Sequence, residues 1–356
     1  MTTAYINRIA TAVPPHDVHA AFLRFAESLF AGDCRRQPIV RRMAALAGID
    51  HRYSFLAPEP CSGAGIDAGS FYARGGFPGT AARMRVYESC APALAAEAVE
   101  RLQLGGERDR ITHLLITTCT GLSAPGLDLE MVERCRLSGS VERSIIGFMG
   151  CYAAISALKL ARHIVRSEPA ARVLVVNVEL CTLHLQETNA LEKVLSFLLW
   201  GDGCAAALVT GTPGGVALES FRGALVPDTR DLMAWNIGDQ GFDMVLSGKV
   251  PRAIQEALSA GADHILQGTP ASAIELWAVH PGGRTVLDAV ERGFHLAPTA
   301  LAASREVLRR YGNMSSATVM FALATLMPFA RKGAAGCAMA FGPGMVAETM
   351  MFRGAG

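Results

Sequence analysis

The sequence predicts a layered α/β fold in which two halves pack closely against each other. Continuous runs of apolar and β-branched residues at 114–118 and 172–178 are typical of strands that helices cover on both faces. Apolar segments of helical length at 153–165 and 318–326 accompany these strands along the chain. Strands that alternate with buried helices indicate an α/β layered architecture rather than a sandwich or a bundle.

Three features recur in the same order in the two parts of the chain, which indicates an internal duplication. The pairs are a polar turn after a strand at Cys119 and His280, a helix start at Gly150-Cys151 and Gly312-Asn313, and a small-residue strand at 201–209 and 334–342. Members of the first two pairs lie about 160 residues apart. We therefore predict two halves, residues 1–210 and 211–356, with a site between them.

Composition narrows the class of protein. Hydrophobic residues make up 51% and charged residues 18%, as in a large α/β enzyme or an obligate oligomer. The formal net charge of +1 gives no reason to expect nucleic acid or an anionic membrane as a partner. Arg8 and Asp17 interrupt the apolar stretch that a secretory signal requires, so we expect a cytoplasmic protein. The apolar stretch 314–330 contains serines, threonines and a proline, which favours a buried helix over a membrane span.

The cysteines are scattered along the chain without metal-ligand spacing. They are Cys34, Cys61, Cys90, Cys119, Cys135, Cys151, Cys181, Cys204 and Cys337. With no CxxC or Cys/His pattern, we expect neither disulfides nor a bound metal. A catalytic cysteine must therefore be distinguished by its local context.

Three residues at the duplicated turns carry side chains suited to catalysis: Cys151, His280 and Asn313. The helix dipole stabilises a thiolate at a helix start, and a neighbouring imidazolium lowers its pKa further. Histidine and asparagine can donate hydrogen bonds to a thioester oxygen that becomes an enolate during decarboxylation. The same residues also fit a core cysteine, a turn histidine and a capping asparagine, and composition leaves both interpretations open.

Four motifs resemble those of chalcone synthase and its bacterial type III polyketide synthase relatives. They are GFMGCYAA around Cys151, WAVHPGGRTVLDAVE around His280, YGNMSSATVMF around Asn313, and AFGPGMVAET near the C-terminus. The resemblance covers nearly the whole chain, in the family's order and spacing. It implies a thiolase-like, duplicated αβαβα layered fold and a decarboxylating acyltransferase that condenses an acyl-CoA primer with malonyl-CoA.

The resemblance also implies residue roles. In that family the cysteine carries the primer and the growing polyketide, the histidine activates the cysteine and polarises the malonyl thioester, and the asparagine assists decarboxylation. By motif these roles fall on Cys151, His280 and Asn313. The residues that match the family's scaffold for the cyclisation cavity are Phe341, Gly342 and Pro343. A homodimer without cofactor or metal is implied as well.

Alignment by motif places several residues in the substrate cavity. Trp200 and Met244 take the places of two phenylalanine gatekeepers of chalcone synthase, so aromatic bulk is kept at only one. Methionine is flexible and can move aside for a longer acyl chain. Residues at positions where plant enzymes carry cavity threonines are Cys119, Cys181 and His184.

Ala124 lies where plant chalcone synthases have a methionine, and this replacement is expected to open space. The surrounding CTGLSAPG segment resembles bacterial alkylpyrone and alkylresorcinol synthases, which favours a tunnel for a fatty acyl chain. His184 favours the opposite, because it adds a bulky polar group where those enzymes usually have a small residue. The length of the primer stays open.

The phosphates of CoA require a local basic patch. The segment from Arg35 to Arg52 supplies arginines in the region that resembles the family's CoA-contacting helix. An ordinary solvated helix face is the alternative. The residues that we assign to CoA contacts are Arg41, Arg42, Arg52, Gly282 and Gly283.

The leading hypothesis is a type III polyketide synthase that loads an acyl-CoA primer, which we expect to be fatty acyl, on Cys151. It extends the primer with malonyl-CoA by decarboxylative Claisen chemistry and cyclises the product to a resorcinol, pyrone or related aromatic. One alternative is a chalcone or stilbene synthase-like enzyme with an aromatic primer. Another is a thiolase-fold acyl-CoA hydrolase or transferase. A non-catalytic scaffold is disfavoured, because all three catalytic-type residues are present.

Overall fold

The computed structural model describes residues 2–60 and 65–356, so Cys61 lies outside the described part. The strands are β1 (Tyr5–Ala12), β2 (His16–Asp17), β3 (Tyr53–Ser54), β4 (His113–Thr118), β5 (Glu142–Gly147), β6 (Arg172–Leu180), β7 (Asp202–Thr210), β8 (Val216–Leu225), β9 (Met233–Gly238), β10 (Gly241–Leu246), β11 (Leu276–Val279), β12 (Ala335–Gly342) and β13 (Val346–Gly354). The α-helices are α1 (His19–Ser28), α2 (Arg36–Ala47), α3 (Thr80–Arg101), α4 (Leu127–Arg134), α5 (Ala153–Ser167), α6 (Leu191–Phe197), α7 (Val250–Ile265), α8 (Arg284–Gly293), α9 (Ala302–Tyr311) and α10 (Ala317–Leu326).

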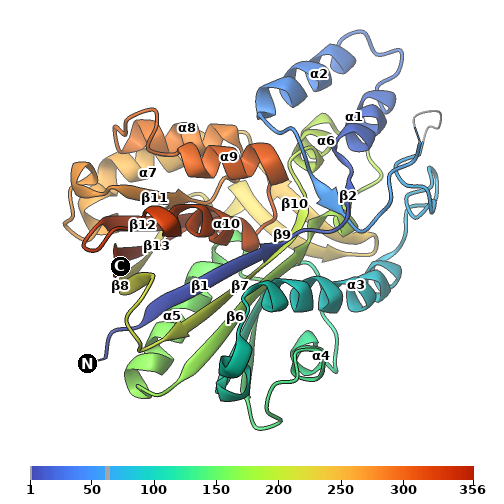
Figure 1. Cartoon of the computed structure of the whole chain (residues 1–356). Coiled ribbons are helices and arrows are strands. Elements are labelled where there is room, and N and C mark those ends of the chain that lie inside the picture. The colour runs from blue at the N-terminus through green and yellow to red at the C-terminus, as the bar shows by residue number, and fades with distance from the viewer. Residues whose placement is uncertain (1, 61–64) are drawn as a thin grey trace.

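Nine strands of the described chain form one mixed sheet in the order β11-β12-β13-β8-β1-β7-β6-β4-β5 (Figure 1). In one group, β4 pairs in parallel with β5 and β6, β6 runs antiparallel to β7, and β7 runs antiparallel to β1. In the other, β11 is parallel to β12, β12 antiparallel to β13, and β13 antiparallel to β8. The two groups share one topology and join where β1 pairs with β8. The fold is therefore a duplicated α/β fold, as predicted.

Two of the three recurring sequence pairs occupy equivalent places in these groups. β4 ends one residue before Cys119, and β11 ends one residue before His280. Gly150 and Gly312 both have positive φ angles, 75° and 69°, in the turns that lead to α5 and α10. These left-handed conformations favour glycine, which explains why both turns begin with it. The duplication thus brings Cys151 and Asn313 to corresponding turns.

The predicted equivalence of the third pair, the small-residue strands at 201–209 and 334–342, is wrong. Segment 201–209 forms β7, whereas 334–342 forms β12, and the topological equivalent of β12 is β6. The two strands share small residues because both are buried against the central helices, as Ala205 and Ala338 show. The two segments resemble each other because both strands pack against buried helices, and not because they occupy equivalent positions in the two halves.

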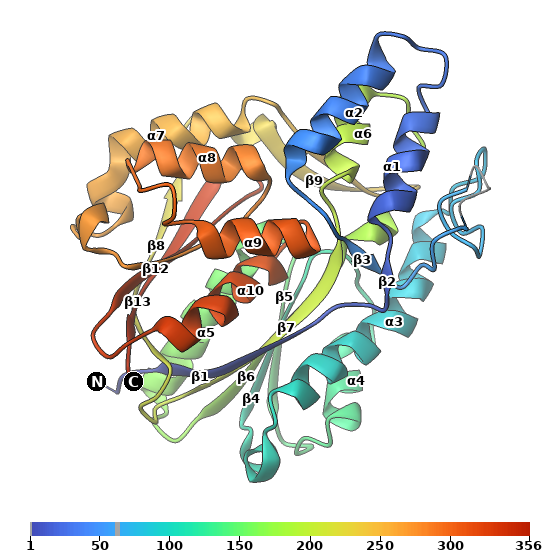
Figure 2. The same ribbon diagram turned by 45° about the horizontal axis from the view of Figure 1, so that its top comes forward.

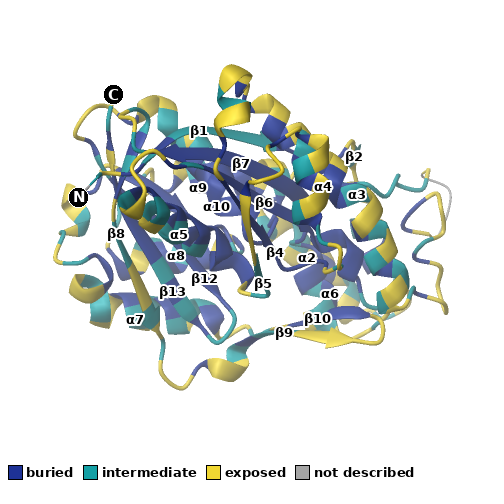
Figure 3. Ribbon diagram, turned by 90° about the horizontal axis from the view of Figure 1, so that it is seen from below, coloured by how far each residue is buried: buried dark blue, intermediate teal, exposed yellow. Residues whose placement is uncertain are grey.

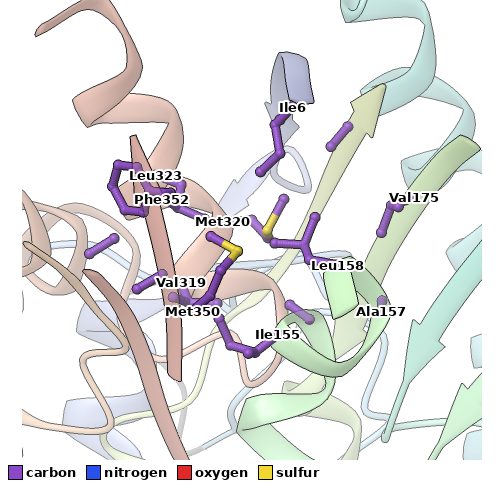
Figure 4. Packing of buried hydrophobic residues seen from close by; sticks show 14 of the residues in the cluster. Ile6, Ile155, Ala157, Leu158, Val175, Val319, Met320, Leu323, Met350 and Phe352 are labelled. Atoms are coloured by element: carbon purple, nitrogen blue, oxygen red, sulfur yellow. The ribbon is translucent and has the colours of Figure 1, made fainter. Parts of the chain in front are cut away.

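The core between the sheet groups is built around the two central helices α5 and α10 (Figure 4). Leu158 of α5 and Met320 of α10 are fully buried in the same cluster as Ile6 of β1. Burying one such side chain contributes about 1.5–3 kcal/mol relative to exposure. Because α10 is apolar on nearly all sides, it is a core helix, as expected for the stretch 314–330. No helix in the described ranges is both long and apolar enough to cross a membrane.

Elements outside the sheet complete the surroundings of the site. Helices α1, α2 and α6 lie together on one side of the molecule, and α7 and α8 lie on the other (Figure 2). The hairpin β9–β10 forms a separate small sheet. The tip of β9 is exposed, while β10 is largely buried (Figure 3). One cavity has walls from α2, α6, the hairpin, α7 and α8.

Candidate active site

A cavity of about 500 Å³ brings the predicted catalytic residues together. Cys151 from the turn before α5, His280 after β11 and Asn313 before α10 all line it. Its apolar lining includes Met43, Leu46, Ala47, Leu195, Leu198, Leu199, Trp200, Met233, Met244, Leu246, Val250, Pro251, Ile254, Val286 and Phe341. Because apolar side chains dominate the wall, the cavity suits a largely apolar ligand held by a few polar groups.

The turn that carries Cys151 is held from behind by the loop after β12. A Cβ atom on Gly150 would lie 2.2 Å from Cδ of Pro343, and one on Gly342 would lie 2.5 Å from Cδ1 of Tyr152. Only glycine permits this close approach of the two backbones. Phe341 lines the cavity, whereas Gly342 and Pro343 support the cysteine turn.

Burial decides the protonation state of Cys151. Its side chain is 6% exposed, and Sγ lies 3.8 Å from the Ser315 hydroxyl. Burial raises the pKa of the thiol to about 12, and the hydrogen bond with Ser315 opposes this only in part. Burial in this state thus acts against the depressed pKa expected from a helix start. The thiol needs a base to become a nucleophile.

His280 lines the same cavity, and we predict that it acts as that base. Its backbone N–H donates to Met339 O at 2.7 Å, and its carbonyl accepts from Gly282 N at 3.0 Å. Both ring nitrogens are buried and have no hydrogen-bond partner among the described residues. Burial lowers the pKa of His280 to about 3, so the imidazole is neutral in this state. A buried ring with two unpaired nitrogens suggests a partner supplied by substrate.

Replacing His280 with glutamine is expected to slow alkylation of Cys151 by iodoacetamide at pH 8 by roughly tenfold or more. The buried thiol, with its pKa raised to about 12, then has no base to take its proton. Below that pKa the variant's rate should rise roughly tenfold per pH unit, because the thiolate fraction does. Peptide mapping measures the rates, with exposed Cys34 as the internal control. Equal Cys151 rates in both proteins would exclude His280 as its base.

Asn313 is fixed by backbone pairing and side-chain bonds. Its N–H donates to Leu199 O at 2.8 Å, and its carbonyl accepts from Gly201 N at 2.9 Å. Its Nδ2 donates to Gly282 O at 3.2 Å, and its Oδ1 accepts from Ser315 N at 2.9 Å. The bond to Ser315 N closes a local Asx turn just before α10, whose N-cap Ser316 has no side-chain cap bond, so Asn313 does not cap that helix. The amide still has a second Nδ2 hydrogen for a ligand in the cavity.

Arg52 was expected to contact CoA, and the structure contradicts this. The residue is fully buried, and its Nη1 donates to Phe197 O at 2.8 Å and Trp200 O at 3.1 Å. A Cβ on Gly312 would lie 2.8 Å from its Cγ. Arg52 therefore supports the backbone around Asn313 from within the protein and cannot reach a phosphate in solvent.

The other proposed CoA residues lie at the mouth of the cavity or near it. Arg41 pairs with Glu27 at 2.9 Å on exposed α2, and Arg42 is exposed on the same helix. Gly282 and Gly283 line the cavity where α8 begins. Sequence reasoning missed one further cation, Arg284.

Arg284, the first residue of α8, also lines the cavity, and its side chain is about half exposed. Its Nη1 donates to Leu46 O of α2 at 3.4 Å, across the mouth. The sequence signal was available, because an arginine directly follows the Pro-Gly-Gly turn. A flexible cation at a helix N-terminus beside the opening suits an anionic group.

Some of the predicted cavity residues line the cavity and others do not. Trp200 and Met244 line the cavity, as expected from the alignment. The described lining does not include Cys119, Cys181 or His184, all of which are buried behind it. Cys119 Sγ accepts a hydrogen bond from Gly150 N at 3.1 Å, so it supports the nucleophile turn. Hydrogen bonds at both ring nitrogens hold His184 to Thr120 O and Phe242 N.

Ala124 is exposed at the surface, preceding a cis peptide bond to Pro125, and is not among the described lining residues of this chain. The expectation that it opens this cavity is therefore wrong for the single chain. The motif alignment could not show which face of its loop points inward, because the loop follows a strand end without periodic burial.

Glu179 is a buried acid that sequence reasoning missed. Its carboxylate accepts hydrogen bonds from Cys119 N at 2.9 Å, the Thr120 hydroxyl at 2.9 Å and the Ser316 hydroxyl at 2.6 Å. Burial raises its pKa to about 7, although these bonds oppose the shift. The signal was an acid within the apolar run 172–180. Glu179 joins the loop after β4 to the turn before α10.

The described residues contain no group of three histidines, cysteines or acids placed to hold a metal ion. A thiol, an imidazole and an amide at equivalent turns of a duplicated α/β fold are the groups of a cysteine-dependent, thiolase-like condensing enzyme.

Comparison with known proteins gives the family. The model for "Chalcone and stilbene synthases, N-terminal domain" matches residues 7–213, and that for the C-terminal domain matches residues 217–356. The chain therefore belongs to the chalcone and stilbene synthase family, the type III polyketide synthases, which are decarboxylating acyltransferases. This confirms the predicted family and the thiolase-like fold.

Individual relatives of the chain are also polyketide synthases. The chain is 31% identical to the alpha-pyrone synthesis polyketide synthase-like protein of Mycobacterium tuberculosis, over 99% of this chain and 91% of that protein. It is 30% identical to 1,3,6,8-tetrahydroxynaphthalene synthase of Streptomyces peucetius, over 98% and 92%. The crystal structure of PKS-I from the brown alga Ectocarpus siliculosus matches with a TM-score of 0.89 at 27% identity, over 99% of both chains.

Proposed function

We propose that this polyketide synthase loads an acyl-CoA primer on Cys151 and extends it with malonyl-CoA. One observation carries the proposal: a single apolar cavity holds Cys151, His280 and Asn313, and His280 has two unpaired ring nitrogens. The imidazole takes the thiol proton as the thiolate attacks the primer thioester; the acyl–sulfur bond to CoA breaks, and the departing CoA thiolate takes that proton back from the imidazolium. His280 and Asn313 then donate to the malonyl thioester oxygen as loss of carbon dioxide leaves an enolate. The enolate carbon attacks the acyl group on Cys151, which frees the thiolate.

We propose a fatty acyl primer and a pyrone, resorcinol or related product. The cavity wall supports an alkyl chain, because Met233, Met244, Leu246, Val250 and Ile254 supply flexible or branched apolar surface. The similarity to a protein of alpha-pyrone synthesis supports the pyrone. An aromatic primer is the second candidate, since Trp200 offers a stacking surface in the same cavity.

The test is incubation with labelled malonyl-CoA and primers from acetyl-CoA through aromatic to long-chain acyl-CoA. We expect carbon dioxide release and extended products by mass spectrometry, with the highest kcat/KM for a long alkyl primer. Free acid and CoA as sole products would indicate a hydrolase instead. Preference for an aromatic primer would overturn the fatty acyl proposal and leave the polyketide synthase activity intact.

Arg284→Ala is expected to raise the KM for acyl-CoA by roughly tenfold with little change in kcat, the size of one charge-assisted hydrogen bond. The reason is its exposed guanidinium at the cavity mouth. Steady-state kinetics measure this, with a matched short thioester that lacks the CoA phosphates as control substrate. Arg331→Ala, which removes an exposed arginine paired with Glu275, is the control variant. An unchanged KM for acyl-CoA would exclude Arg284 as a phosphate contact.

We propose that the protein is a homodimer formed along β5. This strand is one of the two edge strands of the sheet and most of its residues are exposed, whereas the other edge strand, β11, is buried. Exposed apolar side chains gather around it: Leu122, Leu129, Ile145 and Met149. An exposed apolar edge strand favours pairing with another chain. Sedimentation should show a dimer that Ile145→Arg dissociates; a monomeric parent protein would refute the proposal.

Three further proposals accompany this function. The enzyme is proposed to need no cofactor and no metal, because acyl-CoA and malonyl-CoA supply all reacting groups of the condensation. It is proposed to be cytoplasmic, where CoA thioesters are made. The division into residues 1–210 and 211–356 stays a prediction, and it falls between β7 and β8.

A further inference from the structure

His184 occupies a position that the motif alignment assigns to the cavity, yet its ring is used elsewhere. The side chain is 2% exposed, at the end of the short 3₁₀ turn Cys181–His184. Its Nε2 lies 2.7 Å from Thr120 O, and its Nδ1 accepts from Phe242 N at 3.0 Å. Because a carbonyl can only accept, the proton sits on Nε2 and both nitrogens are satisfied. Burial lowers the pKa of His184 to about 3, so the ring stays neutral.

Apart from Thr120 O, the partners of this ring belong to the hairpin β9–β10. The imidazole stacks on Phe242 of β10 at 4.2 Å with an interplanar angle of 9°, and Trp235 of β9 meets it edge-on at 5.4 Å. Trp235 in turn donates from Nε1 to Cys119 O at 2.7 Å. Two successive carbonyls after β4 therefore accept hydrogen bonds from rings. Cys119 O accepts from Trp235 of the hairpin, and Thr120 O accepts from His184, which in turn bonds Phe242 of the hairpin.

The same hairpin supplies the cavity wall. Met233, Met244 and Leu246 line the cavity, and Met244 pairs directly with Trp235 across the two strands. At the other end of the connection, Cys119 Sγ accepts from Gly150 N, next to the nucleophile. The wall and the nucleophile are therefore both fastened to the two residues that follow β4.

We propose that His184 is a positioning residue that holds the β9–β10 wall at a set distance from Cys151 and so limits the length of acyl chain that the cavity accepts. The proposal rests on the proposed polyketide synthase function for its biological meaning. It assigns to His184 an indirect role, through Phe242 and Met244, in place of the cavity contact expected from the sequence. Loss of the ring bonds leaves Thr120 O and Phe242 N unpaired in the interior, so the hairpin must shift to regain partners.

The variants separate hydrogen bonding from bulk. His184→Phe keeps an aromatic ring against Phe242 and removes both bonds. His184→Gln supplies one amide donor and one amide acceptor, and is the conservative rescue. Trp235→Phe removes the bond to Cys119 O alone. His113→Phe is the matched control, because His113 is a buried histidine of β4 that bonds Thr112 rather than the hairpin.

The first measurement is amide hydrogen exchange over residues 233–246, which needs no turnover. We expect faster exchange in His184→Phe and Trp235→Phe, and parental exchange in His184→Gln and His113→Phe. Unchanged protection in His184→Phe would overturn the anchoring role.

The second measurement is calorimetric binding of a short and a long acyl-CoA to each variant in a Cys151→Ala background. In His184→Phe the ratio of the two affinities should change roughly tenfold, the effect of room for about one methylene in an apolar pocket. An equal change for both ligands, or a change in His113→Phe as well, would overturn the inference. A parent enzyme that makes no polyketide would refute the proposed function alone, because neither measurement depends on turnover.

Discussion

Cys151→Ala is expected to abolish covalent primer loading and to lower kcat by roughly 10⁴-fold or more, the size seen when a catalytic nucleophile is removed. The thiol is the only nucleophile proposed in the cavity, and the change deletes a single Sγ atom from a turn that Pro343 supports from behind. The fold should therefore persist. Intact-protein mass spectrometry after incubation with acyl-CoA measures loading, and product mass spectrometry measures turnover.

The control for this prediction is Cys204→Ala, which removes a fully buried thiol of β7 that does not line the described cavity. It should keep loading and product formation. Circular dichroism and the unfolding midpoint report whether either variant is misfolded. An acyl adduct on a folded Cys151→Ala protein, or products at the parental rate, would remove Cys151 from the mechanism.

Asn313→Ala is expected to slow decarboxylation of malonyl-CoA by roughly a hundredfold or more, while primer loading changes much less. The amide is proposed to donate to the enolate oxygen, and that charge develops only during decarboxylation. Release of labelled carbon dioxide measures decarboxylation, and acylation of Cys151 measures primer loading.

Asn313→Asp separates the role of the Nδ2 donor from that of the Oδ1 acceptor in the turn. An aspartate keeps the oxygen that accepts from Ser315 N and loses the Nδ2 donor that bonds Gly282 O. If donation to the enolate is the function, the aspartate variant should be as slow in decarboxylation as the alanine variant. Recovery of decarboxylation in Asn313→Asp, or equal damage to both steps in Asn313→Ala, would show that the role of this residue is to hold the turn before α10.

The three predicted catalytic residues could be identified from the sequence because they follow strand ends or precede helices. Cys151, His280 and Asn313 could be placed together from local patterns, since a duplicated topology puts corresponding turns at one interface. Their motifs were also specific enough to identify the family. The third recurring pair failed, since small-residue strands recur wherever a sheet meets a central helix.

Long side chains were the main source of error. Arg52 looked like a phosphate ligand because it belongs to a basic segment, yet its guanidinium binds the carbonyls of Phe197 and Trp200 in the interior. His184 looked like a cavity residue because its sequence position matches one. In both cases the side chain bonds backbone atoms 58 or more positions away along the chain, and no local pattern records such partners.

The sequence by itself determined the duplicated α/β class, the family and the three residues at the turns, because strand and helix periodicity and motif spacing are local properties of the chain. Only the tertiary structure decided the protonation states of Cys151 and His280, the inward or outward direction of Ala124, and the fastening of the cavity wall by His184. These depend on desolvation and on contacts between segments far apart in sequence, which exist only once the chain has packed.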